Sequence, residues 1–281
     1  MFNLYDGKAS LQGNLLLKPV GLTGNGIMKL DLAEVSSKFF SFNSTWFKAD
    51  TANLNVFDNS NNLAFSAKNL RANIDVKDRD GMFFSNGIGS YVNFPASEYI
   101  CYIDQLKWEM DKEQLTFGNN DPQSKSRSEF ISINNEQDSL SFYAKSADYS
   151  LRDFIINAKG VDSLIVADAI IFPDSGNLTV ERNAKIRTLS NSMIIIDSLV
   201  RYHVFNNSSV DIYSKNNYNA SGDYVYTDAN NIKQPIYFSE IKVNGDTVTF
   251  ASGNVNKEKD FKIGSRYNYY GDIVLIGGLL F

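Results

Sequence analysis

Aromatic side chains are the residues of this chain best suited to bind a ligand. The sequence contains 20 Phe, 15 Tyr and 2 Trp. Trp46 and Phe47 follow three further Phe residues, and such a group could line an apolar groove for acyl chains. Tyr99, Tyr102 and Trp108 could instead stack on sugar rings, as could Tyr91 and the run Tyr267, Tyr269 and Tyr270. Aromatic clusters of this kind are also typical of core packing, so each set has a structural interpretation as well.

A row of carboxylates is the second group that could do chemistry. Asp162, Asp168 and Asp174 follow one another six residues apart, an even spacing that would place them on one face of a continuous strand. Such a row could bind calcium or act as acid and base on a polysaccharide. The alternative is that each residue occupies a corner, because Asp-Ser and Asp-Ser-Gly are ordinary turn sequences. Asp78-Arg79-Asp80-Gly81 resembles part of a calcium loop but lacks its other ligands, so we expect a hairpin turn there.

Nucleophilic and metal chemistry find little support in the sequence. His203 is the single histidine and Cys101 the single cysteine, and no serine lies in a nucleophile elbow. One His and one Cys fall short of a usual zinc ligand set. We therefore expect a protein that is not an enzyme, with no catalytic residue, no metal and no cofactor.

Charge and hydropathy exclude several classes of partner. The net charge is −5, from 27 basic and 32 acidic residues, and the charges are interspersed without a basic stripe, so we expect no nucleic-acid binding. The apolar run 273–281 is too short to span a bilayer as a helix, which needs about 20 residues, so we expect no transmembrane segment. Because the chain stops within this run and the N-terminus lacks the features of a signal peptide, we expect a fragment of a longer protein.

The elements that would position these side chains are expected to be strands. Asn and Ser disfavour helices, while Val, Ile, Phe, Tyr and Thr suit a pleated surface. Alternation of apolar and polar residues predicts a strand near 27–32 after a glycine-rich corner at 19–26, and we prefer a strand to a helix over 184–200. Asn244-Gly245-Asp246 is a hairpin turn signal. We expect one β domain over 1–281, with a possible boundary at the polar window 119–128.

A small recurring unit suggests how the strands are arranged. A bulky apolar residue, a spacer and an Ala recur in Phe47–Ala49, Phe65–Ala67, Phe142–Ala144 and Ile156–Ala158, and in a strand both apolar side chains would point inward. Short strands joined by bends are typical of a solenoid, although the spacing of the units is irregular. The first expectation is therefore an irregular β-helix or β-solenoid, and the alternative is an antiparallel β-sandwich or meander.

Five phrases together resemble the later part of very large β-rich envelope proteins of Bacteroidetes-type bacteria: Gly24–Met28, Phe47–Thr51, Tyr99–Tyr102, Val166–Gly176 and Ala220–Tyr224. The resemblance implies export, and hence a location in the periplasm or at the cell surface. It brings no active site with it.

Three functions remain open. The main hypothesis is a non-catalytic structural or binding segment that contacts another envelope component, such as a protein, or another copy of itself. The second is a hydrophobic β groove that carries lipid, and the third is a β-helix that binds or acts on glycans. The candidate ligand-binding residues are Trp46 and Phe47 for lipid, and Tyr99, Tyr102 and Trp108 for glycans.

Overall fold

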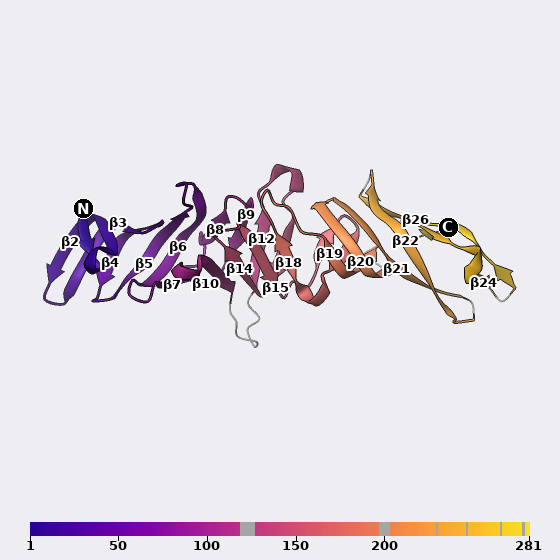
Figure 1. Cartoon of the computed structure of the whole chain (residues 1–281), viewed down its shortest axis with the longest axis horizontal. Helices are drawn as coiled ribbons and strands as arrows, with labels where there is room; N and C mark the ends of the chain where they lie inside the picture. The colour runs from indigo at the N-terminus through magenta and orange to yellow at the C-terminus, as the bar shows by residue number, and fades with distance from the viewer. Residues whose placement is uncertain (119–126, 197–202, 229, 246, 265, 277–278) are drawn as a thin grey trace. The chain divides into compact units, whose positions relative to one another are not determined.

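The chain is all-β, as the composition predicted (Figure 1). The computed structural model describes residues 1–118, 127–196, 203–228, 230–245, 247–264, 266–276 and 279–281. Within these residues there is no α-helix, and therefore no helix long and apolar enough to cross a membrane. The helical elements present are single 3₁₀ turns: η1 (Tyr5–Gly7), η2 (Met110–Lys112), η3 (Asn135–Gln137), η4 (Asp174–Gly176) and η5 (Lys257–Lys259).

The strands form two large sheets and one two-stranded ribbon, β24 (Lys262–Gly264) with β25 (Tyr267–Asn268). The first sheet has 16 strands: β1 (Phe2–Leu4), β2 (Ala9–Lys18), β3 (Gly21–Leu30), β4 (Ala33–Phe42), β5 (Trp46–Phe57), β6 (Leu63–Asp75), β7 (Asp80–Ser85), β8 (Tyr91–Phe94), β9 (Tyr99–Tyr102), β10 (Gln105–Glu109), β11 (Gln114–Gly118), β12 (Ser128–Ser132), β13 (Ser141–Ala144), β14 (Ser146–Ser150), β15 (Ile155–Lys159) and β18 (Leu178–Val180). The second has nine: β16 (Leu164–Val166), β17 (Ala169–Phe172), β19 (Leu189–Ile196), β20 (His203–Ser214), β21 (Asn217–Thr227), β22 (Lys233–Asn244), β23 (Val248–Val255), β26 (Gly271–Ile276) and β27 (Leu279–Leu280).

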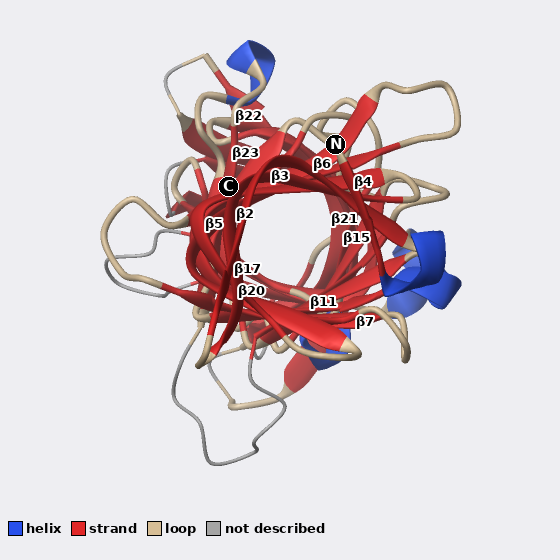
Figure 2. Cartoon of the chain, turned by 90° about the vertical axis from the view of Figure 1, so that its left-hand side faces the viewer, coloured by secondary structure: helices blue, strands red, loops and turns tan. Residues whose placement is uncertain are grey.

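The chain divides into two compact units. The first unit comprises Met1–Asn134, Tyr143–Lys159 and Thr179–Lys185, and the second comprises Asn135–Phe142, Gly160–Leu178 and Ile186–Phe281. Each unit is built on a sheet that curves rather than lying flat (Figure 2, strands in red).

The sheet of the first unit begins as a simple meander and divides at β6. Strands β1 to β6 pair in chain order. The last part of β6, Leu70–Asp75, then pairs with β7, whereas Ser66–Lys68 pairs with β8. One branch continues through β7, β10, β11 and β14, and the other through β8, β9 and β12. A single strand therefore starts both layers of a sandwich.

Asn69 is the residue at which β6 changes partner. Its φ of 56° is left-handed, a conformation that Asn tolerates better than most residues. Its backbone N–H donates to a side-chain oxygen, Asn53 Oδ1, at 3.1 Å, and its carbonyl accepts from Ser90 Oγ at 2.6 Å. Its side chain also donates to the carbonyl of Ile88 at 3.2 Å. These bonds tie the kink to β5 and to the loop before β8.

Aromatic rings fill the space between the two branches. Phe94 of β8 lies with its ring centroid 5.3 Å from Phe117 of β11 and 4.8 Å from Tyr149 of β14. Phe65 and Phe130 complete the cluster, and all five side chains are fully buried. Because Phe94 of β8 contacts Phe117 of β11 and Tyr149 of β14, which are not hydrogen-bonded neighbours of β8, the two branches pack face to face.

The sheet of the second unit curls so that distant strands meet. Asp168, in the turn between β16 and β17, accepts hydrogen bonds from the backbone N–H of Thr249 at 3.0 and 3.1 Å and from its hydroxyl at 2.5 Å. Thr249 lies in β23, which is separated from β17 by β19 to β22 in the sheet. Tyr218 of β21 extends this buried network through a 2.8 Å hydrogen bond to the Thr249 hydroxyl. The Asp168 carboxylate thus fastens one corner of the sheet to a strand far across it.

The β-helix or solenoid that the recurring unit suggested is not confirmed. The strand pairs with a defined register are antiparallel, whereas successive coils of a parallel β-helix pair in parallel. The meander and sandwich alternative describes the sheets. The inward pairs were right: Phe142 with Ala144, and Ile156 with Ala158, are all buried.

Two smaller expectations have mixed outcomes. The glycine-rich corner at 19–26 was wrong in extent, because β3 begins at Gly21 and its glycines lie inside the strand. A Cβ on Gly26 would lie 2.3 Å from the Gln12 carbonyl oxygen, so the close approach of β2 requires glycine there. The predicted boundary at 119–128 falls mainly on residues outside the described ranges, and it stays a prediction, as does the single domain over 1–281.

Candidate functional site

The aromatic residues singled out in the sequence do not form one common site. Phe47 is fully buried in a cluster with Phe40 and Phe42. Trp46 precedes it on β5 and is half-buried, with the ammonium of Lys48 4.4 Å from its ring centroid. Successive residues of a strand point to opposite faces, so Trp46 and Phe47 do not line one groove.

Tyr99 and Tyr102 also lie on opposite faces of their strand, β9. Tyr99 is fully buried, and burial raises the pKa of its phenol well above the ordinary value. Tyr102 is 47% exposed. Only Tyr102 could stack on a ligand at the surface, and Tyr99 is a core residue.

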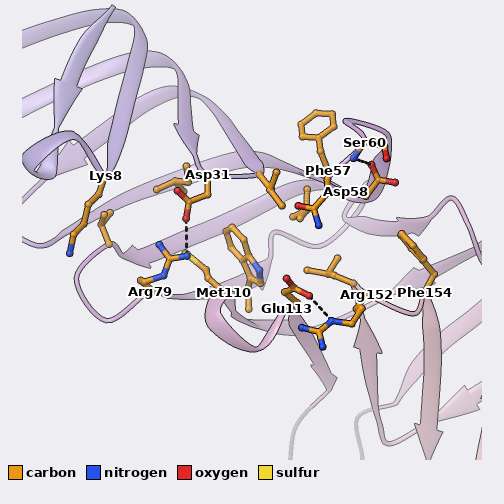
Figure 3. A pocket seen from close by; sticks show the side chains of 17 residues that line it. Lys8, Asp31, Phe57, Asp58, Ser60, Arg79, Met110, Glu113, Arg152 and Phe154 are labelled. Atoms are coloured by element: carbon orange, nitrogen blue, oxygen red, sulfur yellow. Dashed lines mark hydrogen bonds and ion pairs between the residues drawn. The ribbon is translucent and has the colours of Figure 1, made fainter.

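Trp108 differs from the other candidates, because it lines a pocket. This pocket has a volume of about 510 Å³ and lies wholly within the first unit. Its walls are the corners of six hairpins and the ends of the strands beside them, and we call it the corner pocket (Figure 3). Its lining residues are Lys8, Leu30, Asp31, Leu32, Val56, Phe57, Asp58, Asn59, Ser60, Val76, Arg79, Trp108, Met110, Glu113, Leu151, Arg152 and Phe154.

The apolar part of the corner pocket comes from strand ends. Leu30 ends β3, Val56 lies near the end of β5, and Val76 follows β6; all three are buried. Met110 and Phe154 add flexible and aromatic surface. Hairpin corners are usually polar, so an apolar wall assembled from corners is a feature that the β structure alone does not require.

Ion pairs between corners surround this apolar surface. The guanidinium of Arg79, in the turn between β6 and β7, lies 2.8 Å from Asp31 in the turn between β3 and β4, and it also pairs with Asp111. Both carboxylates raise the pKa of Arg79 further. Arg152 lies 3.1 Å from Glu113. In Figure 3, Arg79 is directed toward Asp31 and Arg152 toward Glu113. The Arg79 bridge holds two corners of the curled sheet together.

Trp108 carries the unusual polar atom of the site. The side chain is 5% exposed, and its indole Nε1 is buried with no hydrogen-bond partner among the described residues. A buried donor without a partner costs about 1–3 kcal/mol, and most buried indole N–H groups have one. A residue that lines the corner pocket therefore carries a buried hydrogen-bond donor without a partner among the described residues.

The row of carboxylates predicted on one strand face does not exist in the structure. Asp162 precedes β16, Asp168 occupies the turn between β16 and β17, and Asp174 begins η4. The corner interpretation was correct for all three. The Asp168 carboxylate accepts hydrogen bonds from Thr249. Among the described residues, no group of three or more His, Cys, Asp or Glu side chains is placed to hold a metal ion.

His203 and Cys101 both lie in the interior. His203 Nδ1 is 3.1 Å from the hydroxyl of Tyr224 in the second unit. Cys101 is fully buried in β9, and desolvation raises the pKa of its thiol well above the ordinary value, which suppresses the reactive thiolate. The two residues lie in different units.

An exposed tyrosine pair forms a second surface feature on the first unit. Tyr143 of β13 donates to Glu129 Oε1 at 2.9 Å, and this hydrogen bond raises the pKa of Tyr143. Tyr102 lies opposite Glu129 in the register of β9 and β12. Two exposed aromatic rings thus flank one carboxylate on neighbouring strands, an arrangement in which only Tyr102 was expected from the sequence.

Sequence reasoning missed the corner pocket as a whole because its residues are spread from Lys8 to Phe154. Trp108 was chosen for sugar stacking, not for this position. The one local signal was the repeated presence of an apolar residue beside a charged one at a turn, as in Leu30-Asp31-Leu32 and Leu151-Arg152. Comparison of the chain with family models, curated proteins and solved structures finds no match.

Proposed function

We propose that this chain is a non-catalytic binding segment of the cell envelope, and that its first unit binds an amphiphile whose apolar part enters the corner pocket. The observation that carries the proposal is the apolar surface enclosed by hairpin corners around Trp108. Binding pockets are commonly concave and about 300–1,000 Å³ in volume, and the lining of this pocket is divided almost evenly between apolar and polar residues. The envelope location rests on the sequence resemblance alone.

The character of the lining supports binding rather than catalysis. Its carboxylates are already engaged: Asp31 and Glu113 pair with arginines, and Asp58 accepts backbone N–H groups of its own turn at 2.8 and 2.9 Å. These bonds lower the pKa of Asp58 and keep it ionised. The described residues that line the pocket include neither His nor Cys. A site of this kind offers apolar contact and a polar edge, without an activated nucleophile or a free general base.

Native mass spectrometry of the whole chain, followed by solvent extraction, tests the proposal. We expect a co-purifying or added amphiphile of one-to-one stoichiometry. Leu32→Glu should abolish binding, because Leu32 lines the pocket and a carboxylate there would have to be desolvated by an apolar tail. Leu17→Glu is the matched control, because Leu17 is 80% exposed on β2 and lies outside the pocket lining.

The proposal fails if the purified chain gives a ligand-free mass that does not change when amphiphiles are added. It also fails if Leu32→Glu and Leu17→Glu bind equally well. Both leucines are exposed enough for the charged variants to fold, since Leu32 is 41% exposed, so loss of binding can be separated from loss of structure by a circular dichroism spectrum.

The exposed tyrosine pair favours glycan binding as a second candidate function. Tyr102 and Tyr143 present aromatic faces on either side of Glu129, and aromatic faces with an adjacent acceptor suit a sugar ring. Titration calorimetry with soluble oligosaccharides should then show binding that Tyr102→Ala and Tyr143→Ala each remove. Tyr213→Ala, at an exposed tyrosine of the second unit, should leave it unchanged. Absence of heat with every oligosaccharide would leave the contact with another envelope protein as the remaining hypothesis for this surface.

A further inference from the structure

The indole N–H of Trp108 identifies the chemical class of the amphiphile, an inference that rests on the proposed function of the corner pocket. Trp108 lies in β10, with Gly81 of β7 and Leu115 of β11 opposite it in the two registers. Its backbone is therefore held by strand pairing on both sides. The indole donor is buried and has no hydrogen-bond partner among the described residues.

An acceptor supplied by a ligand would remove this penalty. Free energy lost by burying an unpaired donor is recovered when a partner of suitable geometry arrives. Sites that contain a buried polar group discriminate strongly in favour of ligands that pair it. The acceptor must be compatible with an apolar neighbourhood, and a carbonyl oxygen attached to an alkyl chain meets that condition.

The charges around the pocket argue against a ligand with a net charge. Lys8, Arg79 and Arg152 are its basic lining residues, and Asp31, Asp58 and Glu113 its acidic ones. Arg79 pairs with two carboxylates and Arg152 with one. An anionic head group would compete with these carboxylates for the guanidinium groups, whereas an uncharged head group leaves the ion pairs intact.

We propose that the corner pocket recognises an acyl ester or amide with an uncharged head group, and that the Trp108 N–H donates a hydrogen bond to its carbonyl oxygen. The indole nitrogen is out of reach of water in the ligand-free chain, so the carbonyl must displace part of the lining as it enters.

The two tryptophans make this contact directly observable. Trp46 and Trp108 are the only tryptophans in the sequence, so ¹⁵N-labelled indole groups give two N–H resonances by NMR, assigned with Trp46→Phe. The probes are 1-monododecanoylglycerol and 1-O-dodecylglycerol, which have the same chain and head group but differ in the ester carbonyl. We expect the ester to move the Trp108 resonance downfield and the ether to leave it near its ligand-free position. The Trp46 resonance should not respond to either probe.

Affinity measurements complete the test. By titration calorimetry the wild-type chain should bind the ester about three- to tenfold more tightly than the ether, as expected for one neutral hydrogen bond. Trp108→Phe should bind the two probes equally and at the affinity of the ether, which also shows that the pocket is intact.

Two results would overturn the inference, and they are distinguishable. If both probes bind but the ester has no advantage or the Trp108 resonance does not move, the carbonyl contact is wrong while the proposed function stands. If neither probe binds to the wild-type chain and neither resonance moves, both the inference and the proposal of an apolar ligand in this pocket are wrong.

Discussion

Replacement of Phe94 by Ala tests whether the two branches of the first sheet really enclose a filled core. The Phe94 ring is fully buried and lies 4.8 Å from Tyr149, 5.3 Å from Phe117 and 5.6 Å from Phe65 between ring centroids. A buried Phe→Ala change costs about 3–5 kcal/mol. Each aromatic pair adds about 0.5–1.5 kcal/mol beyond burial, so we place the loss for Phe94→Ala at the upper end, about 4–5 kcal/mol.

Urea unfolding followed by tryptophan fluorescence measures this loss of stability in the first compact unit of the chain. Trp46 and Trp108 both lie in the first unit, so their fluorescence reports its unfolding. With a urea dependence of about 2 kcal/mol/M, Phe94→Ala should lower the midpoint by about 2 M. The matched control is Phe39→Ala, because Phe39 is 54% exposed on β4; its loss should stay below about 1 kcal/mol.

Equal shifts for Phe94→Ala and Phe39→Ala would refute the face-to-face packing of the two branches. A small loss at Phe94 would mean that the space between the branches is open and accessible to solvent. The pocket proposed above would then be part of a larger groove, and its boundaries would have to be drawn again.

Three further predictions concern the kink at Asn69, the hydrogen bonds of Asp168 to Thr249, and the buried phenols of Tyr149 and Tyr218. Asn69→Val should destabilise the first unit by about 2 kcal/mol or more, because a β-branched residue at a left-handed φ is strained; Asn69→Gly should cost less, and an equal cost for the two variants in urea unfolding would contradict this explanation. Asp168→Ala should make the amide of Thr249 exchange its hydrogen faster, because it removes the carboxylate that accepts this N–H, at a cost of about 1.5–3 kcal/mol. Unchanged exchange would show that the Asp168 hydrogen bonds contribute nothing to stability. Burial raises the pKa values of Tyr149 and Tyr218 above their ordinary value, so their contribution to stability is complete below pH about 10 and is lost as the pH rises further. Unfolding midpoints at pH 7, 9 and 11 should therefore fall only at the highest pH, and Tyr218→Phe should reduce the fall.

Local patterns predicted the strands and several corners correctly. The hairpin at Asn244 and Gly245 joins β22 to β23, and the turn around Arg79 joins β6 to β7. The 184–200 window contains β19 rather than a helix. These features depend on neighbouring residues: a period of two, and turn residues with suitable φ values.

Pairing and sites could not be predicted in the same way. A period of two shows which side chains share a face, but it does not show which strand lies beside them. Nothing next to Asn69 indicates that β6 pairs with two strands on one side, and an irregular series of inward pairs was equally compatible with a solenoid. The corner pocket depends on the curl of the sheet that brings Asp31 to Arg79, which is a property of the assembled unit.

The division of the sheet at β6 has a consequence for how this chain can change during evolution. Ser66–Lys68 and Leu70–Asp75 supply the pairing edge for two layers at once. Insertion of one residue before Ser66 would turn the side chains of both segments to the opposite face, so the buried side chains of Ala67, Leu70 and Ile74 would leave the core together. Hairpin corners elsewhere can lengthen freely, since they disturb one connection each. We therefore expect related chains to differ in length at their corners and to keep the length of this one strand.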